Sequence, residues 1–399
     1  FIGLTESYEG EGYDRKNLKI PQNQEKLLAE IAETVGKDNI AAISFGGAPM
    51  DFSFEKNVGA ILHMYLGGQA VGESVADLIS GEVNPSGKLA ETIPFSEKDT
   101  PAWRYFAPPN DDVEYRESIF VGYRYYETFH VPVKYPFGYG LSYTSFSYSE
   151  LNVSEVYSGG KIQIRFKIKN IGKVSGAEIA QLYVCPNESD VIRSHIELKG
   201  FQKIYLHPGE EKEVILELDE RSFSVYDVEK KAFSMLSGKY QICIGASVHD
   251  LQLKANIEVV GNSYFRNERE LFPDYFREQP HGMEISAEQF YQLLGGEPKH
   301  DKEKKRGEYT VYDSYQDVVN VSMFGKFVRG IVHIGLKIML RGKSERDPAF
   351  KMVKMGVEEG NLEGLIATSG GIATPKLIDM LVYNANKKYL QAFKRLLKK

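Results

Sequence analysis

Residues 19–47 have the sequence KIPQNQEKLLAEIAETVGKDNIAAISFGG, in which a helical pattern is followed directly by a strand pattern. Pro21 stands where a helix would begin and Gly36 where it would end. Between them, apolar residues recur at helical spacing, namely Leu27, Leu28, Ile31 and Val35. Residues 39–47 form a continuous apolar run of the kind found in strands that are buried on both faces. A helix followed by such a strand indicates a mostly parallel sheet covered by helices.

The same alternation of strand and helix extends over residues 1–140. An apolar run at Phe1–Leu4 predicts a short strand, and a polar loop containing several glycines follows it. Residues 58–80 contain a second strand pattern and a second helical pattern, which Gly81 ends. We therefore predict a truncated, mostly parallel α/β sandwich here. Because a strand at residue 1 has no earlier strand in this chain to pair with, we expect further residues upstream.

The sequence pattern changes to an all-β one over residues 141–262. Strand-like runs are separated by turns rich in Gly, Asn, Pro and Asp. The runs are KIQIRFKIKN (161–170), EIAQLYVCP (178–186), EKEVILELD (211–219), YQICIGAS (240–247) and LQLKANIEVV (251–260). Short strands with alternating apolar and polar residues at this spacing predict a β-sandwich of the immunoglobulin or fibronectin type III kind.

Residues 263–399 are predicted to form a linker and then a mainly helical region. The stretch 297–308, EPKHDKEKKRGE, is a run of charges that we expect to be solvated. Helical patterns follow at 321–343 and at 375–399. The whole chain is therefore predicted to have several domains, with an α/β part, an all-β part and a helical part in that order.

The helical pattern at 321–343 carries basic side chains along one face, at Lys326, Arg329, His333 and Lys337. A helix that crosses the hydrocarbon core of a bilayer does not carry such a stripe, so we expect no membrane span here. Two interpretations remain. The favoured one is an amphipathic helix packed on the body of the protein, and the other is a helix that lies on an anionic membrane surface.

The composition is that of an ordinary globular protein, with 42% hydrophobic and 26% charged residues. A formal net charge of −6 creates no field that attracts nucleic acid, so we expect no nucleic-acid partner. The two cysteines, Cys185 and Cys243, are too few for a disulfide framework and lack the spacing of metal ligands. Both lie in strand-like runs, which predicts buried free thiols and favours a reducing, cytoplasmic location.

The strongest candidate for a reactive element is the heptad at residues 9–15, EGEGYDR, in the loop after the first predicted strand. Such loops, at the carboxyl ends of parallel strands, are where α/β sheets bind ligands. Glycines flank Glu11 on both sides and allow the backbone to present its carboxyl group to a cleft. A general acid must be protonated near neutral pH, so we expect Arg15 to pair with Asp14 and not with Glu11. Taken alone, the heptad is more typical of a solvated surface loop.

The wider sequence resembles the second half of the α/β sandwich domain of the family 3 glycoside hydrolases. The matching strings include FIGLTESYEGEGYDR (1–15), KIPQNQEKLLAEIA (19–32), ISFGGAPM (43–50), NPSGKL (84–89), VGYRYY (121–126) and PFGYGLSYT (136–144). The strings KNIGKVSGAEIAQLYV (169–184), ELKGFQKIYLHPGEEKEV (197–214) and SGKYQICIGAS (237–247) resemble the fibronectin type III-like domain that follows in many members. The resemblance covers residues 1–260, and the rest resembles a helical extension of some bacterial members.

The resemblance implies that the chain supplies one half of a retaining glycosidase site. In this family a TIM-barrel domain supplies an aspartate nucleophile, and the α/β domain supplies the general acid/base, which is the glutamate of an EGYDR-like motif. The matching residue here is Glu11. Retaining hydrolysis needs the two carboxyl groups about 5–5.5 Å apart. No segment of this sequence has the eight strand–helix repeats of a barrel, so we expect the chain alone to be inactive.

The implied substrate is an oligosaccharide or β-glycoside with a terminal, non-reducing glucosyl or xylosyl unit. The resemblance implies no cofactor and no metal ion, and the sequence assigns no residue to sugar binding. The implied partner is the N-terminal TIM-barrel domain that this chain lacks. The alternative hypothesis is a non-catalytic carbohydrate-binding or scaffold module with the same α/β and fibronectin-like parts.

Three positions depart from the family pattern. Phe52 and Phe54 follow the GGAP run, where many members have Trp, and Ala90 stands where Pro is customary in LAETIP. These changes leave the acid/base assignment intact and bear on local packing and leaving-group recognition. For a nearby group of tyrosines we favour interdomain packing over a role in lining a sugar cleft. The group consists of Tyr125, Tyr126, Tyr135 and Tyr139.

Overall fold

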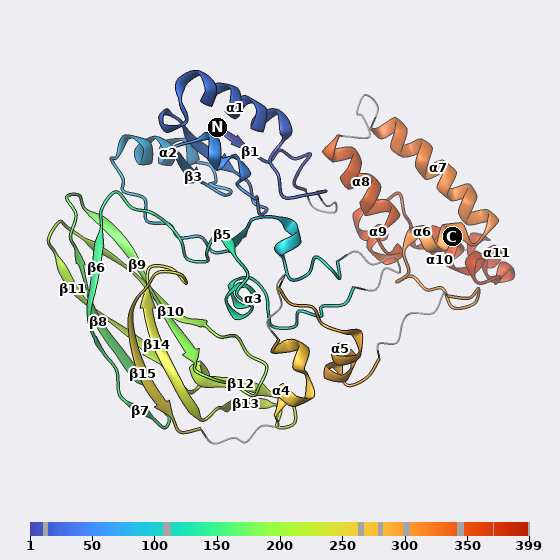
Figure 1. Cartoon of the computed structure of the whole chain (residues 1–399). Helices are drawn as coiled ribbons and strands as arrows, with labels where there is room; N and C mark the ends of the chain where they lie inside the picture. Colours follow the sequence, from blue (N-terminus) through green and yellow to red (C-terminus); the bar gives the residue numbers. More distant parts are fainter. Residues whose placement is uncertain are drawn as a thin grey trace. The chain divides into compact units, whose positions relative to one another are not determined.

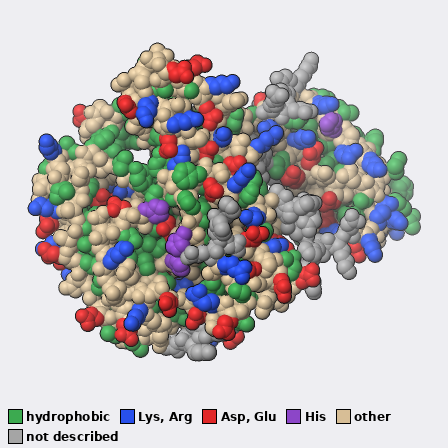
Figure 2. All heavy atoms as spheres, in the orientation of Figure 1, with side chains coloured by type: hydrophobic (Ala, Val, Ile, Leu, Met, Phe, Trp, Pro, Cys, Tyr) green, Lys and Arg blue, Asp and Glu red, His purple; other side chains and the backbone are tan. Residues whose placement is uncertain are grey.

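The computed structural model describes residues 1–10, 15–106, 113–261, 267–277, 282–297, 304–340, 347–369 and 371–397 (Figure 1). The chain divides into two compact units. One contains residues 1–48, 60–66 and 299–399, and the other contains residues 49–59 and 67–298. On the face shown in Figure 2, acidic and basic side chains are interspersed, in keeping with the small net charge.

The N-terminal part contains a parallel sheet with the strand order β1-β2-β3. Strand β1 (Ile2–Gly3) pairs with β2 (Ala41–Phe45), and β2 pairs with β3 (Ala60–His63). Helix α1 (Gln22–Val35) connects the first two strands. Because the three strands run in the same direction, the loops that follow β1, β2 and β3 all leave the sheet at the same edge.

Helix α1 is fixed to the first strand by a side-chain amide. The Gln24 side chain accepts a hydrogen bond from the backbone N–H of Gly3 at 2.8 Å and donates one to the carbonyl oxygen of Gly3 at 3.0 Å. The helix begins after Pro21 and ends at Gly36, as its sequence pattern predicted. Its buried Leu28 adds an apolar contact, so this helix is held by both polar and hydrophobic interactions.

The rest of the α/β half lies in the second unit. Helix α2 (Val71–Ser80) ends at Gly81, whose φ of 80° is a left-handed conformation that glycine adopts easily. Strands β4 (Ile93–Pro94) and β5 (Val133–Tyr135) pair in antiparallel fashion, and helix α3 (Tyr123–Thr128) precedes β5. The predicted α/β class of the N-terminal part is therefore confirmed.

A β-sandwich follows, with sheet orders β10-β9-β14-β15-β7 and β11-β8-β6. The strands of the first sheet are β7 (Val156–Tyr157), β9 (Gly176–Pro186), β10 (Glu197–Leu206), β14 (Gly238–Gly245) and β15 (Leu251–Val259). Those of the second are β6 (Phe146–Asn152), β8 (Ile162–Asn170) and β11 (Glu211–Leu218), and β12 (Ser224–Asp227) with β13 (Ala232–Met235) forms a separate pair. The five strands expected from the sequence are β8, β9, β11, β14 and β15, which confirms the predicted sandwich.

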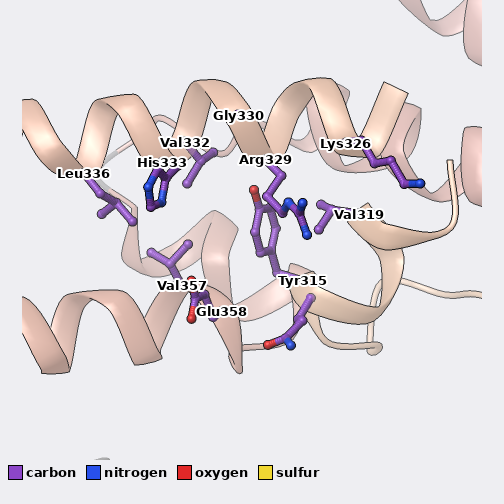
Figure 3. A pocket seen from close by; sticks show the side chains of 11 residues that line it. Tyr315, Val319, Lys326, Arg329, Gly330, Val332, His333, Leu336, Val357 and Glu358 are labelled. Atoms are coloured by element: carbon purple, nitrogen blue, oxygen red, sulfur yellow. The ribbon is translucent and has the colours of Figure 1, made fainter. Parts of the chain in front are cut away.

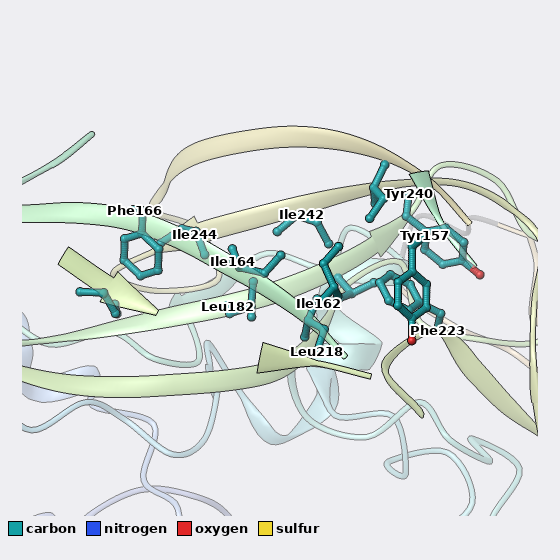
Figure 4. Packing of buried hydrophobic residues seen from close by; sticks show 14 of the residues in the cluster. Tyr157, Ile162, Ile164, Phe166, Leu182, Leu218, Phe223, Tyr240, Ile242 and Ile244 are labelled. Atoms are coloured by element: carbon teal, nitrogen blue, oxygen red, sulfur yellow. The ribbon is translucent and has the colours of Figure 1, made fainter. Parts of the chain in front are cut away.

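The two sheets enclose an apolar core (Figure 4). Along β8, inward and outward residues alternate as a half-buried strand requires. Ile164 and Phe166 of β8 meet Leu182 of β9 and Ile242 of β14 in this core, and none of the four is more than 1% exposed. Removal of this apolar surface from water is the main force that holds the sandwich together.

One buried amide joins the α/β half to the sandwich within the second unit. The Gln181 side chain, on β9, donates to the carbonyl oxygens of Gly138 at 3.1 Å and of Ala246 at 2.6 Å. The Tyr183 hydroxyl donates to the same amide oxygen at 2.5 Å. Gly138 has a φ of 81°, and a Cβ atom there would overlap the Gln181 side-chain oxygen. The close approach therefore requires glycine at this position.

The segment after the sandwich packs on α3. Helices α4 (Glu268–Leu271) and α5 (Ala287–Leu294) flank apolar residues that pack against Tyr125 and Tyr126. These residues include Phe272, Tyr275, Met283 and Ile285, none more than 2% exposed. Tyr125 and Tyr126 thus have a packing role. By contrast, Tyr135 stacks on Tyr139 at 5.3 Å and donates to the Glu55 carboxylate at 2.6 Å.

Residues 304–397, hereafter the helical region, have an apolar core of their own. Its helices are α6 (Tyr315–Asn320), α7 (Met323–Met339), α8 (Pro348–Glu358), α9 (Leu362–Thr368), α10 (Pro375–Ala385) and α11 (Tyr389–Leu397). Val318, Leu362 and Leu381 are among the fully buried residues that hold α6, α9 and α10 together. In the described part of the chain, no helix has both the length and the apolar character needed to cross a bilayer.

The helical pattern at 375–399 forms two helices and not one. Lys387 adopts a φ of 58°, which breaks the helix between α10 and α11. The neighbouring Asn386 side chain accepts from the backbone N–H groups of Gly307 and Tyr309, each at 2.9 Å, and donates to the Tyr309 carbonyl at 2.7 Å. These three bonds to a distant segment fix the break at this point.

Candidate active site

The candidate catalytic residue Glu11, together with Asp14, lies outside the described residues. The expected pairing of Arg15 with Asp14 therefore stays a prediction. The described residues nearest to Glu11 are Gly10 on one side and Arg15 on the other, in the loop after β1. The described part of the site consists of the residues that hold this loop in place.

The loop after β1 is attached to the loop after β2 by the Glu9 carboxylate. One carboxylate oxygen accepts the backbone N–H of Gly47 at 2.9 Å and that of Ala48 at 3.0 Å. The other oxygen is 3.2 Å from the same Gly47 nitrogen. Hydrogen bonds to an ionised carboxylate are stronger than bonds between neutral groups. Glu9 therefore fixes the chain two residues before Glu11.

The loop after β3 joins the same edge of the sheet. The backbone N–H of Gly46 donates to the Tyr65 carbonyl at 3.2 Å, and the N–H of Met64 donates to the Ser44 carbonyl at 2.9 Å. The loops after all three parallel strands are thus connected through the turn at Gly46–Ala48. This is the edge at which α/β sheets place ligand-binding residues.

A buried histidine lies at the same edge. The His63 Nδ1 atom is 2.9 Å from the hydroxyl of Ser44, which is fully buried. Desolvation by burial lowers the pKa of His63 from 6.5 to about 4, although the contact with Ser44 acts in the opposite direction. The Tyr65 ring lies 4.0 Å from the imidazole, centroid to centroid. A neutral imidazole in this position supports the ends of β2 and β3 and is not protonated for acid catalysis near neutral pH.

We expect His63 to make the protein less stable as the pH falls from about 6.5 to about 4. The unfolded chain takes up a proton near pH 6.5, whereas the folded chain resists it, so the contribution is complete above this range and is lost through it. The measurement is the melting temperature of the wild type and of His63→Gln across this pH range. As the pH is lowered, the melting temperature of the wild type should decrease more than that of the variant. A constant difference would show that burial does not perturb this histidine.

Of the three positions that depart from the family pattern, Phe52 and Phe54 have packing roles, whereas Ala90 is exposed. Phe52 and Phe54 are at most 2% exposed, with ring centroids 5.5 Å apart. Phe52 also meets the Tyr135 ring edge-on at 5.9 Å.

Cys185 and Cys243 are free thiols, of which Cys243 is buried and Cys185 is half-buried. Across the described ranges, no three His, Cys, Asp or Glu side chains lie close enough together to hold a metal ion.

In the sequence, Glu9 is only the first residue of the heptad at 9–15, and nothing in that pattern indicates its anchoring role. The Ser44–His63 pair was also missed. In both cases the partners lie far apart in sequence, with separations of 38 and 39 residues for Glu9 and 19 for Ser44. The consecutive glycines at 46 and 47 were the available signal, because a glycine turn after a buried strand leaves backbone N–H groups accessible.

Comparison with protein families assigns a class to this architecture. Residues 1–143 match the glycosyl hydrolase family 3 C-terminal domain, and residues 178–248 match a fibronectin type III-like domain. The thermostable beta-glucosidase B of Acetivibrio thermocellus is 45% identical over 261 residues, which are 65% of this chain and 34% of that protein. An exo-alpha-(1->6)-L-arabinopyranosidase of Bifidobacterium breve is 37% identical over 66% of this chain and 34% of its own length.

Solved structures agree with this assignment. The family 3 beta-glucosidase of Bifidobacterium adolescentis aligns with a TM-score of 0.62 and 37% identity, over 66% of this chain and 39% of that one. The Kluyveromyces marxianus beta-glucosidase in complex with glucose aligns with a TM-score of 0.61 and 35% identity, over 66% and 32% of the two chains. The chain spans about a third of the length of the curated relatives it matches. Residues 1–143 thus correspond to the C-terminal domain of glycosyl hydrolase family 3, and the matched part of the chain is similar to a C-terminal portion of these relatives.

Proposed function

We propose that this chain is the C-terminal part of a retaining β-glycosidase that removes terminal, non-reducing β-linked glucosyl or xylosyl units. Glu11 is its general acid/base, and a TIM-barrel domain outside the chain supplies the nucleophile. The observation that supports the proposal is the Glu9 anchor, which holds the chain two residues before Glu11 at the edge where parallel α/β sheets commonly bind ligands. The match to the family 3 C-terminal domain and the names of the relatives support the reaction class.

The proposed reaction has two steps. In the first, the nucleophile of the partner domain attacks the anomeric carbon while Glu11 donates its proton to the leaving oxygen, and a glycosyl-enzyme forms. In the second, the same Glu11 carboxylate takes a proton from water, which attacks the anomeric carbon and releases the sugar with its original configuration. A single residue must therefore reach the glycosidic oxygen and then the water, so its backbone has to be held in place.

The sugar contacts are assigned to the partner domain. None of the described loop residues at the sheet edge was predicted to bind sugar, and relatives that share this portion include both glucosidases and an arabinopyranosidase by name. Sugar identity would then be set outside the chain. Hydrolysis of 4-nitrophenyl β-glucoside and β-xyloside by the full-length protein, with and without Glu11→Gln, tests the proposal. Loss of turnover in the variant is expected, and wild-type turnover would favour a non-catalytic module.

We expect Glu9→Ala to lower kcat of the full-length protein roughly tenfold, because the loop loses its charge-assisted anchor and Glu11 is less well positioned. Glu9→Gln keeps one oxygen acceptor and should lose less. The loss of kcat/KM, which reports the first step, should be larger for an alkyl β-glucoside than for 2,4-dinitrophenyl β-glucoside, since only the poor leaving group needs the acid in that step. Equal losses on both substrates, or an unchanged kcat, would contradict the positioning role.

A further inference from the structure

The helical region contains a pocket of about 430 Å³ between α6, α7 and α8 (Figure 3). One side of the pocket is apolar, with Val332 and Leu336 from α7 and Val357 from α8. The other side is basic, with Lys326 and Arg329 from α7, while His333, also from α7, lies beside Val332 (Figure 3). The basic stripe predicted from the sequence therefore borders a cavity.

The basic side chains are suited to an anion. The Arg329 guanidinium donates to the Asn320 side-chain oxygen at 2.7 Å, which fixes its orientation while using only part of its donor capacity. Among the described residues, no acidic side chain pairs with the Lys326 ammonium group. Glu358 is the single acid that lines the pocket, and its carboxylate is 4.0 Å from Lys354 on its own helix. The lining is therefore net positive.

A second, independent observation is the Tyr315 hydroxyl at the centre of the pocket lining. Tyr315 is 5% exposed, and its hydroxyl is buried without a hydrogen-bond partner among the described residues. In Figure 3 its ring extends from α6 toward α7, beside Arg329. Burial raises the pKa of this phenol to about 12, so the group keeps its proton at neutral pH. A buried donor without an acceptor is unfavourable, and a ligand oxygen would relieve it.

The charge distribution along the chain also favours anion binding near the C-terminal end. Residues 304–399 contain 18 lysines and arginines against 9 aspartates and glutamates, a net charge of +9. Since the whole chain has a net charge of −6, residues 1–303 have a net charge of −15. This C-terminal stretch therefore attracts anions although the protein as a whole does not.

We propose that this pocket binds a phosphate ester, with the phosphate between Lys326, Arg329 and the Tyr315 hydroxyl and the ester carbons against the valine and leucine side. A phosphate dianion offers three acceptor oxygens and two negative charges, which match two permanent cations and a hydroxyl donor better than a carboxylate does. The pocket shares no lining residue with the sheet edge that holds Glu9, and phosphate binding is proposed independently of glycosidase activity.

The ester has two possible sources, a free metabolite or a phospholipid headgroup. Beside its basic stripe, α7 exposes an apolar row that no described residue covers, with exposures of 54% to 85%. The row consists of Met323, Phe327, Ile331, Ile334 and Ile338. This row would enter a lipid surface if the phosphate came from a headgroup, whereas a soluble ester would leave it in water.

Binding of glycerol 3-phosphate to the full chain is measured by calorimetry. Binding of the full chain to phosphatidylcholine vesicles, with and without phosphatidic acid, is measured by cosedimentation. We expect saturable binding that Lys326→Gln and Arg329→Gln each weaken at least about tenfold and Tyr315→Phe weakens less. Lys337→Gln is the matched control, because Lys337 lies on the same stripe of α7 but does not line the pocket.

Binding of glycerol 3-phosphate supports a soluble ester, and binding confined to phosphatidic acid vesicles supports a headgroup, provided that Lys326 and Arg329 are required. The proposal is overturned if neither probe binds up to about 10 mM phosphate. It is also overturned if Lys337→Gln weakens binding as much as Lys326→Gln, since that would indicate general attraction to a basic surface.

Discussion

Glu11→Gln in the full-length protein is expected to lower kcat for an alkyl β-glucoside by roughly 10²- to 10⁴-fold, the usual contribution of general acid–base catalysis. Glutamine cannot donate a proton to the leaving oxygen or accept one from water, but it occupies nearly the same volume. With 2,4-dinitrophenyl β-glucoside the first step needs no acid, so the glycosyl-enzyme should accumulate and a burst should appear. The measurement is steady-state and pre-steady-state kinetics on both substrates.

Azide distinguishes this role from a general loss of structure. Azide attacks the glycosyl-enzyme without base assistance, so it should restore turnover of the activated substrate by Glu11→Gln and yield a β-glycosyl azide. Glu30→Gln is the matched control, because Glu30 is an exposed carboxylate on α1 and should behave as the wild type. If Glu11→Gln also behaves as the wild type, Glu11 is only a loop carboxylate and the binding-module hypothesis gains support.

Phe166→Ala is expected to lower the free energy of unfolding of the sandwich by about 3–5 kcal/mol, because it removes a fully buried ring and leaves a cavity. Phe166 is 1% exposed and belongs to the apolar core. For a domain of this size the melting temperature should fall by about 10–20 °C. Differential scanning calorimetry of the full chain measures the change as a shift of the sandwich transition.

Phe201→Ala provides the comparison for this core substitution. Phe201 lies on β10 of the same sandwich but is 67% exposed, so its loss should change the transition by a few degrees at most. A shift of the same size for both variants would mean that burial does not determine the stability of this domain. A core that collapses around the smaller alanine side chain would give a smaller loss, since the cost depends on the cavity that remains.

The sequence predicted the elements whose signal is local. Helix α1 has an apolar period, a starting Pro21 and an ending Gly36, and strand β8 alternates over nine residues. Such patterns are sufficient because each residue's environment repeats with the geometry of its own element. The motif strings indicated the family, and the resemblance to the family implied the role that is proposed for Glu11. Neither source of information depended on knowing which distant segments touch.

The features that the sequence did not predict depend on distant partners. The break after α10 follows from the bonds of Asn386 to Gly307 and Tyr309, which lie 77 to 79 residues earlier. Phe272 lies in the predicted linker, next to charged residues, yet it is buried against α3. Likewise, the anchoring function of Glu9 depends on a turn beyond the next helix. Tertiary contacts of this kind override local composition and leave no periodic trace.

The Gln181 amide has a consequence for modularity. The Gln181 side chain donates hydrogen bonds to the backbone of Gly138 and of Ala246. The α/β half and the sandwich therefore both contribute to this contact, and neither could form it alone. A graft of this sandwich onto a different α/β domain would leave the amide unsatisfied unless glycine stood at the position of Gly138. The α/β half and the sandwich should therefore be exchanged between relatives, in evolution and in protein engineering, as one cassette.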